Sequence, residues 1–400
     1  MNFPRILKKR KGYIDRIKPF MQKSVIKVLT GQRRVGKSFL LYQLIEEILA
    51  EEPDANIIYV NLEDFTFSSQ QTAEDLHPYI ISHSKEKVKN YIFIDEIQDI
   101  PGFEKVIRSL LLNEDNDIYI TGSNAKMLSG ELATYLSGRY IEFKIYSLSY
   151  SEFLEFHGLT ESETSYELYS RYGGLPYLLN LPLEDETVNE YLKSVYSTIV
   201  FRDVVSRYKL RNTLFLEKLI QFLSENIGNL FSAKNISDYL KSQHTTISVN
   251  QIQSYTEYLN NAFLIHRVER YDLIGKRVFE IGEKYYFENM GIRNIVVGYR
   301  ITDKAKILEN LVYNHLLYKG YDIKVGYYGD KEIDFIGEKN GEKLYIQVAL
   351  KIDGDTAERE FGNLLKIQDN YPKIVLTEDT FSGNSYEGIR HCPIRQFLME

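Results

Sequence analysis

The stretch TGQRRVGKSFL, residues 30–40, decides the fold of this chain. It follows the apolar run at residues 25–29 and leads into a segment with helical spacing, residues 37–50. Two glycines stand five residues apart in a loop that also holds two arginines and a lysine. Glycine is unfavourable in a loop unless the backbone turns tightly or approaches another group closely. The spacing G-x-x-x-x-G-K-S between a buried strand and a helix therefore predicts a loop that wraps phosphate groups.

Each residue type of this loop has an expected task. Backbone N–H groups surround a phosphate, and the following helix directs its first N–H groups at the same anion. Lys37 is predicted to bridge the β- and γ-phosphates of ATP, and the Ser38 hydroxyl to bind Mg²⁺. A glycine loop without a ligand is the alternative. The predicted nucleotide-binding residues of the loop are Gly31, Gln32, Arg33, Arg34, Val35, Gly36, Lys37, Ser38 and Phe39.

A loop of this kind needs a second strand that ends in an acid near the metal. The segment YIFIDEIQ, residues 91–98, supplies it. Asp95 is predicted to hold Mg²⁺, and Glu96 to act as the catalytic residue that polarises the attacking water. Adjacent carboxylates at the end of a buried strand are unfavourable without partners, so a salt bridge is the alternative.

A third strand, DIYI at residues 117–120, runs into the polar sequence Thr-Gly-Ser-Asn. A polar side chain at this point can contact the γ-phosphate and the attacking water. Asn124 is predicted to do so as a catalytic residue, with Ser123 as the alternative. A plain turn after the strand is the other reading.

Composition bounds the class of protein. The 400 residues predict two to three domains, and the net charge of -7 argues against a general nucleic-acid coat. Residues 1–50 carry twelve Lys and Arg but three Asp and Glu, which suits an anionic partner such as phosphate, or a solvated basic face. Cys392 is the only cysteine, which excludes an intrachain disulfide and a cysteine zinc cluster. Neither a signal peptide nor a membrane span is evident, so no membrane contact and a cytoplasmic location are expected.

Strand-like segments alternate with helical ones in the first part of the chain. Strands separated by helices predict an α/β fold with a parallel sheet and helices on both faces. We therefore predict a P-loop ATPase core over residues 1–150. Its expected strands are residues 25–30, 56–62, 91–94, 117–120 and 140–145.

The rest of the chain is predicted to form three further regions. Residues 151–210 carry apolar residues at helical spacing and are predicted to form a helical lid. Residues 211–300 show three helical segments followed by two strands, the order of a winged helix. Residues 301–400 show a helix, three strand-like segments, a helix at 357–369 and a strand, which predict a small α/β domain.

With these motifs the chain resembles the AAA+ ATPases. The Asp-Glu pair and the polar residue on the next strand are their pattern. In that superfamily an arginine follows the next helix, and Arg139 stands at this point of the chain. The resemblance implies that Arg139 is an arginine finger, a catalytic residue that meets the γ-phosphate bound by a neighbouring subunit of a homo-oligomer. An intramolecular salt bridge of Arg139 is the alternative.

The resemblance extends along nearly the whole chain. The segment YGGLPYLL, residues 172–179, resembles the sensor-2 region of the AAA+ lid, which implies that Pro176 binds nucleotide. Many relatives have arginine after this proline, where this chain has Tyr177. Through a larger set of motifs, the chain also resembles a bacterial and archaeal subfamily of AAA-type ATPases. Members of this subfamily have a C-terminal domain of unknown function. They are TGQRRVGKS, FIDEIQ, TGSN, LSGR, YSEFLEF, GGLP, FRDVVSRY and KYYFENMGIRN.

The predicted winged helix has polar residues that could contact DNA, because basic side chains bind phosphate and amides read base edges. Acidic neighbours dilute their charge, and packing against the lid is the alternative. The candidates are Lys241, Asn250, Gln251 and Gln253 on the helices, and Arg267, Arg270, Lys276 and Arg277 on the hairpin.

Residues 301–400 resemble the PD-(D/E)xK nuclease fold, whose carboxylates bind Mg²⁺ while a lysine stabilises charge. Glu309 fits the helix acid and Asp334 the strand acid. The third motif departs, because Gln347 and Ala349 stand where Glu and Lys are required, and Lys351 comes two residues late. A fold retained for binding is favoured over active cleavage.

These features predict an ATPase that couples ATP hydrolysis to a conformational change acting on DNA or on a protein partner. A slow-turnover, nucleotide-dependent switch that recruits partners is the alternative. An ATP-gated nuclease is the third and least favoured hypothesis.

Overall fold

The computed structural model describes residues 8–128, 136, 138–273, 275, 282–329, 331–352, 354–378 and 385–400. The chain divides into two compact units, each described separately below. The first is Met1–Tyr146 with Asn261–Phe263, and the second is Ser147–Asn260 with Leu264–Glu400. Among the described residues, no helix is both long and apolar enough to cross a membrane.

The first unit is built on a five-stranded parallel sheet, which confirms the predicted α/β class with a parallel sheet. The strands lie in the order β2-β3-β4-β1-β5. Their bounds are β1 (Ile26–Thr30), β2 (Asn56–Asn61), β3 (Asn90–Asp95), β4 (Asn116–Gly122) and β5 (Tyr140–Lys144). The helices of this unit are α1 (Lys11–Ile17), α2 (Lys37–Glu51), α3 (Ala73–His83) and α4 (Phe103–Leu110).

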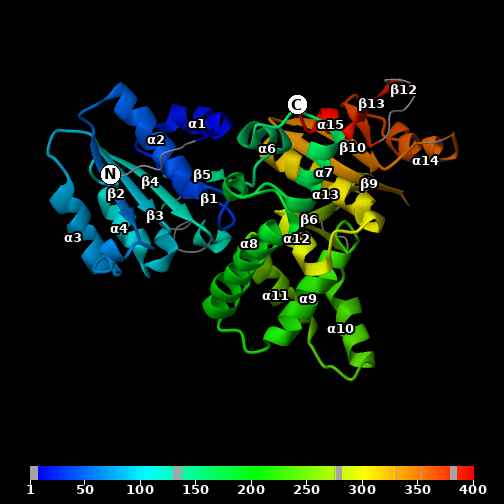
Figure 1. Cartoon of the computed structure of the whole chain (residues 1–400), viewed down its shortest axis with the longest axis horizontal. Helices are drawn as coiled ribbons and strands as arrows, with labels where there is room; N and C mark the ends of the chain where they lie inside the picture. The colour runs from blue at the N-terminus through cyan, green and yellow to red at the C-terminus, as the bar shows by residue number, and fades with distance from the viewer. Residues whose placement is uncertain are drawn as a thin grey trace. The chain divides into compact units, whose positions relative to one another are not determined.

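Figure 1 shows α2, α3 and α4 arranged around this sheet. Because side chains alternate along the strands, the two faces of the sheet carry different residues. One face is aliphatic and packs against α3 and α4, with Ile92, Ile94 and Ile120 at its centre. The opposite face is largely aromatic, and there Tyr59 packs against Tyr42 of α2. Burial of both faces explains why the strands appear in the sequence as continuous apolar runs.

A buried ion pair joins the two central strands on the aromatic face. Lys27 of β1 and Asp117 of β4 are bonded to one another and neither side chain is exposed. The Tyr119 hydroxyl donates a 2.8 Å hydrogen bond to Asp117, and the Lys27 ammonium lies 4.5 Å from the Tyr119 ring centroid. Because an unpaired buried charge is strongly destabilising, this pair favours the placement of β4 next to β1.

The second unit contains both helices and strands. Its helices are α6 (Tyr150–His157), α7 (Glu163–Tyr172), α8 (Asp185–Thr198), α9 (Thr213–Glu225), α10 (Ala233–Ser242), α11 (Val249–Asn261), α12 (Met290–Val297), α13 (Lys304–Tyr318), α14 (Gly354–Leu365) and α15 (Ile394–Phe397). A π-helix, Ile199–Ser206, continues α8 through the segment FRDVV. α14 starts three residues before the predicted helix and ends four residues before its predicted end. The helix ends at Leu365. Asp369, which is the last residue of the predicted helix, lies outside the helix and accepts a hydrogen bond from the Tyr345 hydroxyl.

An eight-stranded mixed sheet forms the rest of this unit, in the order β12-β13-β11-β10-β9-β8-β6-β7. Its strands are β6 (Ile265–Asp272), β7 (Glu283–Phe287), β8 (Asp322–Tyr328), β9 (Lys331–Lys339), β10 (Glu342–Ala349), β11 (Lys373–Thr377), β12 (Ser385–Tyr386) and β13 (Ile389–Pro393). The predicted hairpin is present, because β6 and β7 pair antiparallel. β6 also pairs in parallel with β8, so one sheet takes strands from both sides of residue 300. The finer division into lid, winged helix and nuclease-like domain stays a prediction.

Candidate functional site

The predicted phosphate loop joins β1 to α2, and two of its positions require glycine. Gly36 has a φ of 96°, in the left-handed region, directly before α2 begins at Lys37. A Cβ at Gly31 would lie 2.1 Å from the backbone oxygen of Ile145. The loop therefore turns sharply into a helix whose first N–H groups have no partner inside the helix.

The Lys37 side chain folds back along this loop and is buried. Its ammonium donates 3.0 Å hydrogen bonds to the carbonyl oxygens of Gly31 and Gln32. The same nitrogen lies 3.6 Å from a carboxylate oxygen of Glu96. Lys37 thus brings a positive charge to the inside of the loop, where phosphate oxygens are predicted to bind.

Strand order brings the predicted acids to the same edge of the sheet as the loop. β4 lies between β1 and β3, with Thr30 opposite Gly122 and Ile94 opposite Ile120. Parallel strands end at the same edge, so the residues after β1, β3 and β4 lie close together. Thr121 joins two of these residues, since its hydroxyl accepts the Glu96 N–H at 2.9 Å and donates to Asp95.

Burial and hydrogen bonds have opposite effects on Asp95. Burial and the neighbouring charge of Glu96 raise the pKa of Asp95. Hydrogen bonds from Ser38 and Thr121 and the charge of Lys37 act in the other direction without cancelling this rise. The Asp95 carboxylate lies next to the Ser38 hydroxyl, as a shared Mg²⁺ site requires. Because its pKa is raised, a cation bound beside it would stabilise its charged form.

Glu96 is buried but kept charged. Burial alone would raise the pKa of Glu96, yet the charges of Lys37 and Arg33 and hydrogen bonds from Gln98 and Ser123 lower it to about 2. Gln98 donates at 2.6 Å and Ser123 at 2.9 Å to the same carboxylate oxygen. Glu96 also has a φ of 57°, an uncommon conformation for a residue other than glycine. The carboxylate is held in one place as an anion at neutral pH.

The structure separates the two candidates after β4. The Ser123 hydroxyl is engaged by Glu96, whereas the buried Nδ2 of Asn124 has no hydrogen-bond partner among the described residues. Gln98 Oε1 is likewise buried without a partner in that part of the chain. Buried polar atoms of this kind are rare unless a ligand or water meets them. The residues at this edge of the sheet thus fit a bound Mg²⁺-nucleotide.

The other predicted loop residues differ in exposure. Arg33 is buried and donates at 2.7 Å to Glu63, while Arg34 is exposed and has a φ of 70°. Val35 is buried, and Phe39 is half exposed on the first turn of α2. Their contacts to nucleotide stay predictions.

Arg139 and Pro176 lie further along the chain. Arg139 is exposed immediately before β5, and its guanidinium makes no ion pair or hydrogen bond with the described residues. Among the described residues, Arg139 therefore does not form the intramolecular salt bridge that was the alternative interpretation. Pro176 begins a short 3₁₀ helix, Pro176–Asn180, in the second unit.

Sequence reasoning missed Arg10, which supports the loop from outside. Its guanidinium is buried and donates hydrogen bonds to the backbone oxygens of Val35 at 3.2 Å and Tyr146 at 2.8 Å. The backbone N–H of Arg10 is bound by Gln43 of α2 at 3.0 Å. In the sequence, Arg10 is one of several basic residues in LKKRK, and nothing there distinguishes it.

The residues proposed for DNA contact are only partly exposed. Lys241, Asn250 and Gln253 are exposed on α10 and α11. On the hairpin, Arg267 pairs with Glu269 at 3.3 Å and Arg270 lies over the Tyr327 ring. Lys276 and Arg277 lie outside the described residues.

The nuclease-like acids do meet, but around a lysine that sequence reasoning missed. Lys284 of β7 is buried, with its ammonium 3.0 Å from Glu309 and 2.7 Å from Glu332. Burial alone lowers the pKa of Lys284, but the charges of Glu309, Asp334 and Glu332 outweigh this and raise it. Burial and Glu309 raise the pKa of Asp334, whose carboxylate accepts the Val348 N–H at 2.8 Å. A side-chain cation thus occupies the cluster in which a nuclease would hold metal.

We expect Lys284→Met to destabilise the protein by about 3–5 kcal/mol at neutral pH, because it leaves buried acids without a counter-charge. In that variant the acids would have higher pKa values in the folded than in the unfolded state. The loss should therefore be larger at high pH and shrink as the pH falls and the acids take up protons. Urea unfolding of Lys284→Met and of the exposed control Lys366→Met measures it. Equal stability of the two variants would show that the cluster is held by something other than this lysine.

Comparison with known proteins identifies relatives over most of the chain. Residues 23–154 match a family described as an AAA domain, and residues 163–303 match a domain of unknown function. An uncharacterised protein of Haemophilus influenzae is 38% identical over 98% of this chain and 98% of its own length. An uncharacterised protein of Methanocaldococcus jannaschii is 31% identical over 84% of this chain and 77% of its own length.

Solved structures give a weaker likeness. The ORC1 protein of Aeropyrum pernix, solved in complex with DNA, is 13% identical, with a TM-score of 0.34 over 73% of this chain and 93% of that chain. A TM-score this low carries no conclusion about fold or function. The sequence relatives and the two matched families, by contrast, confirm the predicted family. The chain belongs to the bacterial and archaeal AAA-domain family that carries a C-terminal domain of unknown function.

Proposed function

We propose that this chain is a Mg²⁺-dependent ATPase. The observation that carries the proposal is the buried, charged carboxylate of Glu96, which lies 3.6 Å from the ammonium of Lys37. Acids with shifted pKa values cluster at functional sites, and Glu96 follows β3 directly, beside the lysine of the phosphate loop. The position of both residues at one edge of a parallel sheet supports the same reading.

Binding is assigned to the loop and to the first turn of α2. The N–H groups of the loop and the Lys37 ammonium would bind the β- and γ-phosphates of ATP, because both present positive charge to the same space. Ser38 and Asp95 would hold Mg²⁺, which when bound neutralises phosphate charge. A ligand in the loop would take over the hydrogen bonds that Lys37 now donates to loop carbonyls.

Hydrolysis is assigned to Glu96. Its carboxylate would accept a hydrogen bond from the attacking water and then its proton. Gln98 and Ser123 are positioning residues, since they hold one oxygen and leave the other to face Lys37. The Nδ2 of Asn124, which has no hydrogen-bond partner among the residues that the structure describes, would donate to the γ-phosphate or to the water.

We further propose that hydrolysis drives a conformational change that acts on DNA or on a protein partner. The exposed polar residues of α10 and α11 support a DNA contact. The slow-turnover switch remains the alternative, because the same loop and acids serve both. The lysine within the nuclease-like acids supports a binding role for the C-terminal region over cleavage.

ATPase rates measured with and without duplex DNA, at a molecular mass fixed by light scattering, test this proposal. The working ATPase is expected to hydrolyse ATP faster when DNA is added, and the increase should fall with rising salt if phosphate contacts carry it. An unchanged rate would remove DNA as the partner. Near-zero turnover with retained nucleotide would favour the switch.

The arginine-finger hypothesis makes a separate prediction. Arg139→Ala is expected to lower ATP hydrolysis at least about 10³-fold while leaving ATP affinity within about threefold, because a finger acts on transition-state charge. Mixing Arg139→Ala with Lys37→Ala should partly restore activity, since some interfaces then combine an intact loop with an intact arginine. Complete failure of the mixture, in a sample that forms mixed oligomers, would argue against action between subunits.

A further inference from the structure

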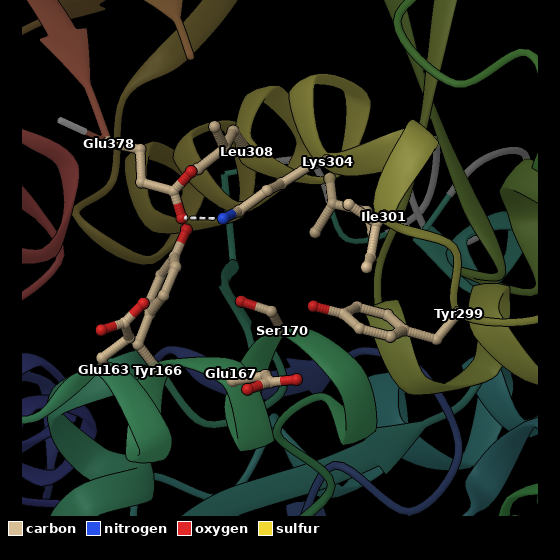
Figure 2. A pocket seen from close by; sticks show the side chains of 10 residues that line it. Glu163, Tyr166, Glu167, Ser170, Tyr299, Ile301, Lys304, Leu308 and Glu378 are labelled. Atoms are coloured by element: carbon tan, nitrogen blue, oxygen red, sulfur yellow. Dashed lines mark ion pairs between the residues drawn. The ribbon is translucent and has the colours of Figure 1, made fainter. Parts of the chain in front are cut away.

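The second unit contains a cavity that the ATPase proposal does not use. Its volume is about 190 Å³, and it lies between α7, the start of α13 and Glu378 at the end of β11 (Figure 2). A cavity of about 150 Å³ already accommodates a molecule of the size of benzene. The space is therefore sufficient for a ligand of six to eight non-hydrogen atoms, by order of magnitude.

Two buried hydroxyls face this cavity without satisfied hydrogen bonds. Tyr166 and Ser170 of α7 are 5% and 4% exposed. The two hydroxyls interact, but neither forms a hydrogen bond of normal geometry with a described residue. Figure 2 shows the Tyr299 hydroxyl directed across the space toward Ser170. Unsatisfied buried hydroxyls are costly, which points to a polar group that meets them when the site is filled.

The charge of the lining decides which kind of ligand fits. Three carboxylates line the cavity, those of Glu163, Glu167 and Glu378, against one ammonium, that of Lys304. Lys304 is already paired with Glu378 at 2.7 Å, so Glu163 and Glu167 remain as excess negative charge at the mouth. The nearby Arg171 is paired with Asp185. An anionic ligand would meet repulsion, whereas a cation would be attracted.

We propose that this cavity binds a small organic cation carrying a primary ammonium group. The ammonium would donate hydrogen bonds to the carboxylates of Glu163 and Glu167, and its remaining polar or apolar end would lie against Tyr166, Ser170 and Tyr299. Tyrosine rings favour a cation over an anion at short range. The lining comes from segments more than a hundred residues apart along the chain, so a bound cation would link α7 to α13 and stabilise the second unit.

Calorimetric titration of the full chain with 1,4-diaminobutane tests the proposal. We expect saturable binding with a Kd on the order of 0.1–1 mM, in keeping with a ligand of this size. Butane-1,4-diol and butyrate, which match its length without the positive charge, should not bind at the same concentrations. No saturable binding of the diamine, or equal binding of the diol, would overturn the proposal.

Variants place the binding in this cavity. Glu167→Gln is expected to weaken diamine binding about tenfold, the effect of one charge-assisted hydrogen bond. Tyr166→Phe should weaken it less, and Glu190→Gln, an exposed control on α8, should leave it unchanged. Thermal unfolding without ligand shows that each variant is folded. Equal affinity of Glu167→Gln and the control would place any binding elsewhere and contradict the proposal.

A second probe distinguishes two sources of the same ammonium group. Nα-acetyl-lysine methylamide carries the ammonium on a peptide backbone, as a partner's lysine would. If Nα-acetyl-lysine methylamide binds more tightly than 1,4-diaminobutane, the occupant is a lysine side chain of a protein. If it binds more weakly, the occupant is a free amine.

Discussion

Lys37→Ala is expected to abolish measurable ATP binding, with a loss of affinity of at least about 100-fold. The buried Lys37 ammonium hydrogen-bonds to the loop carbonyls of Gly31 and Gln32, inside the loop where the phosphates are proposed to bind. Calorimetric titration with Mg²⁺ and a non-hydrolysable ATP analogue measures the loss. Lys105→Ala, which removes an exposed lysine of α4, is the matched control and should bind as the unmodified chain does.

A structural effect of this substitution has to be separated from the binding effect. Without Lys37, the buried carboxylate of Glu96 loses the strongest of the charges that lower its pKa, so the variant is expected to be less stable. Adding Glu96→Gln removes that unpaired charge and should restore stability but not nucleotide binding. ATP affinity that is unchanged in folded Lys37→Ala would contradict the assignment of the loop.

Glu96→Gln is expected to retain ATP binding within about threefold and to lower hydrolysis about 10²–10⁴-fold. The amide has the same shape and can still accept hydrogen bonds from Gln98 and Ser123, but it cannot take a proton from water. Single-turnover hydrolysis separates this loss from any change in binding. Glu114→Gln, at an exposed position before β4, is the control.

Two other outcomes for this variant would change the account. Hydrolysis at the normal rate would show that another group accepts the proton. Loss of binding together with hydrolysis would show that Glu96 holds the site in shape rather than acting on water.

The first sheet could be predicted almost completely from the sequence. The inner strands β1, β3 and β4 are buried on both faces and so appear as apolar runs. The predicted ranges agree with β1 to β5 within one or two residues. The loop could be recognised from its glycines, because a position such as Gly31 has no space for a side chain. The motifs themselves predicted the roles of Asp95, Glu96 and Asn124, and family resemblance added those of Arg139 and Pro176. All of these roles stay predictions.

Contacts between segments distant along the chain could not be predicted. Ser123 meets Glu96 only because β3 and β4 are neighbours in a particular register. Lys284 appears in the sequence as one residue of a family motif, and its partners Glu309 and Glu332 become visible only when β7, α13 and β9 are packed. Local spacing does not encode these contacts, because they depend on how the sheets are assembled.

A structure determined with Mg²⁺ and a non-hydrolysable ATP analogue tests the central claim most directly. We predict phosphate oxygens within hydrogen-bond distance of Lys37 and the loop N–H groups, Mg²⁺ beside Ser38 and Asp95, and Glu96 facing the γ-phosphate. Saturable binding in solution together with phosphates located anywhere other than the Gly31–Ser38 loop would contradict it.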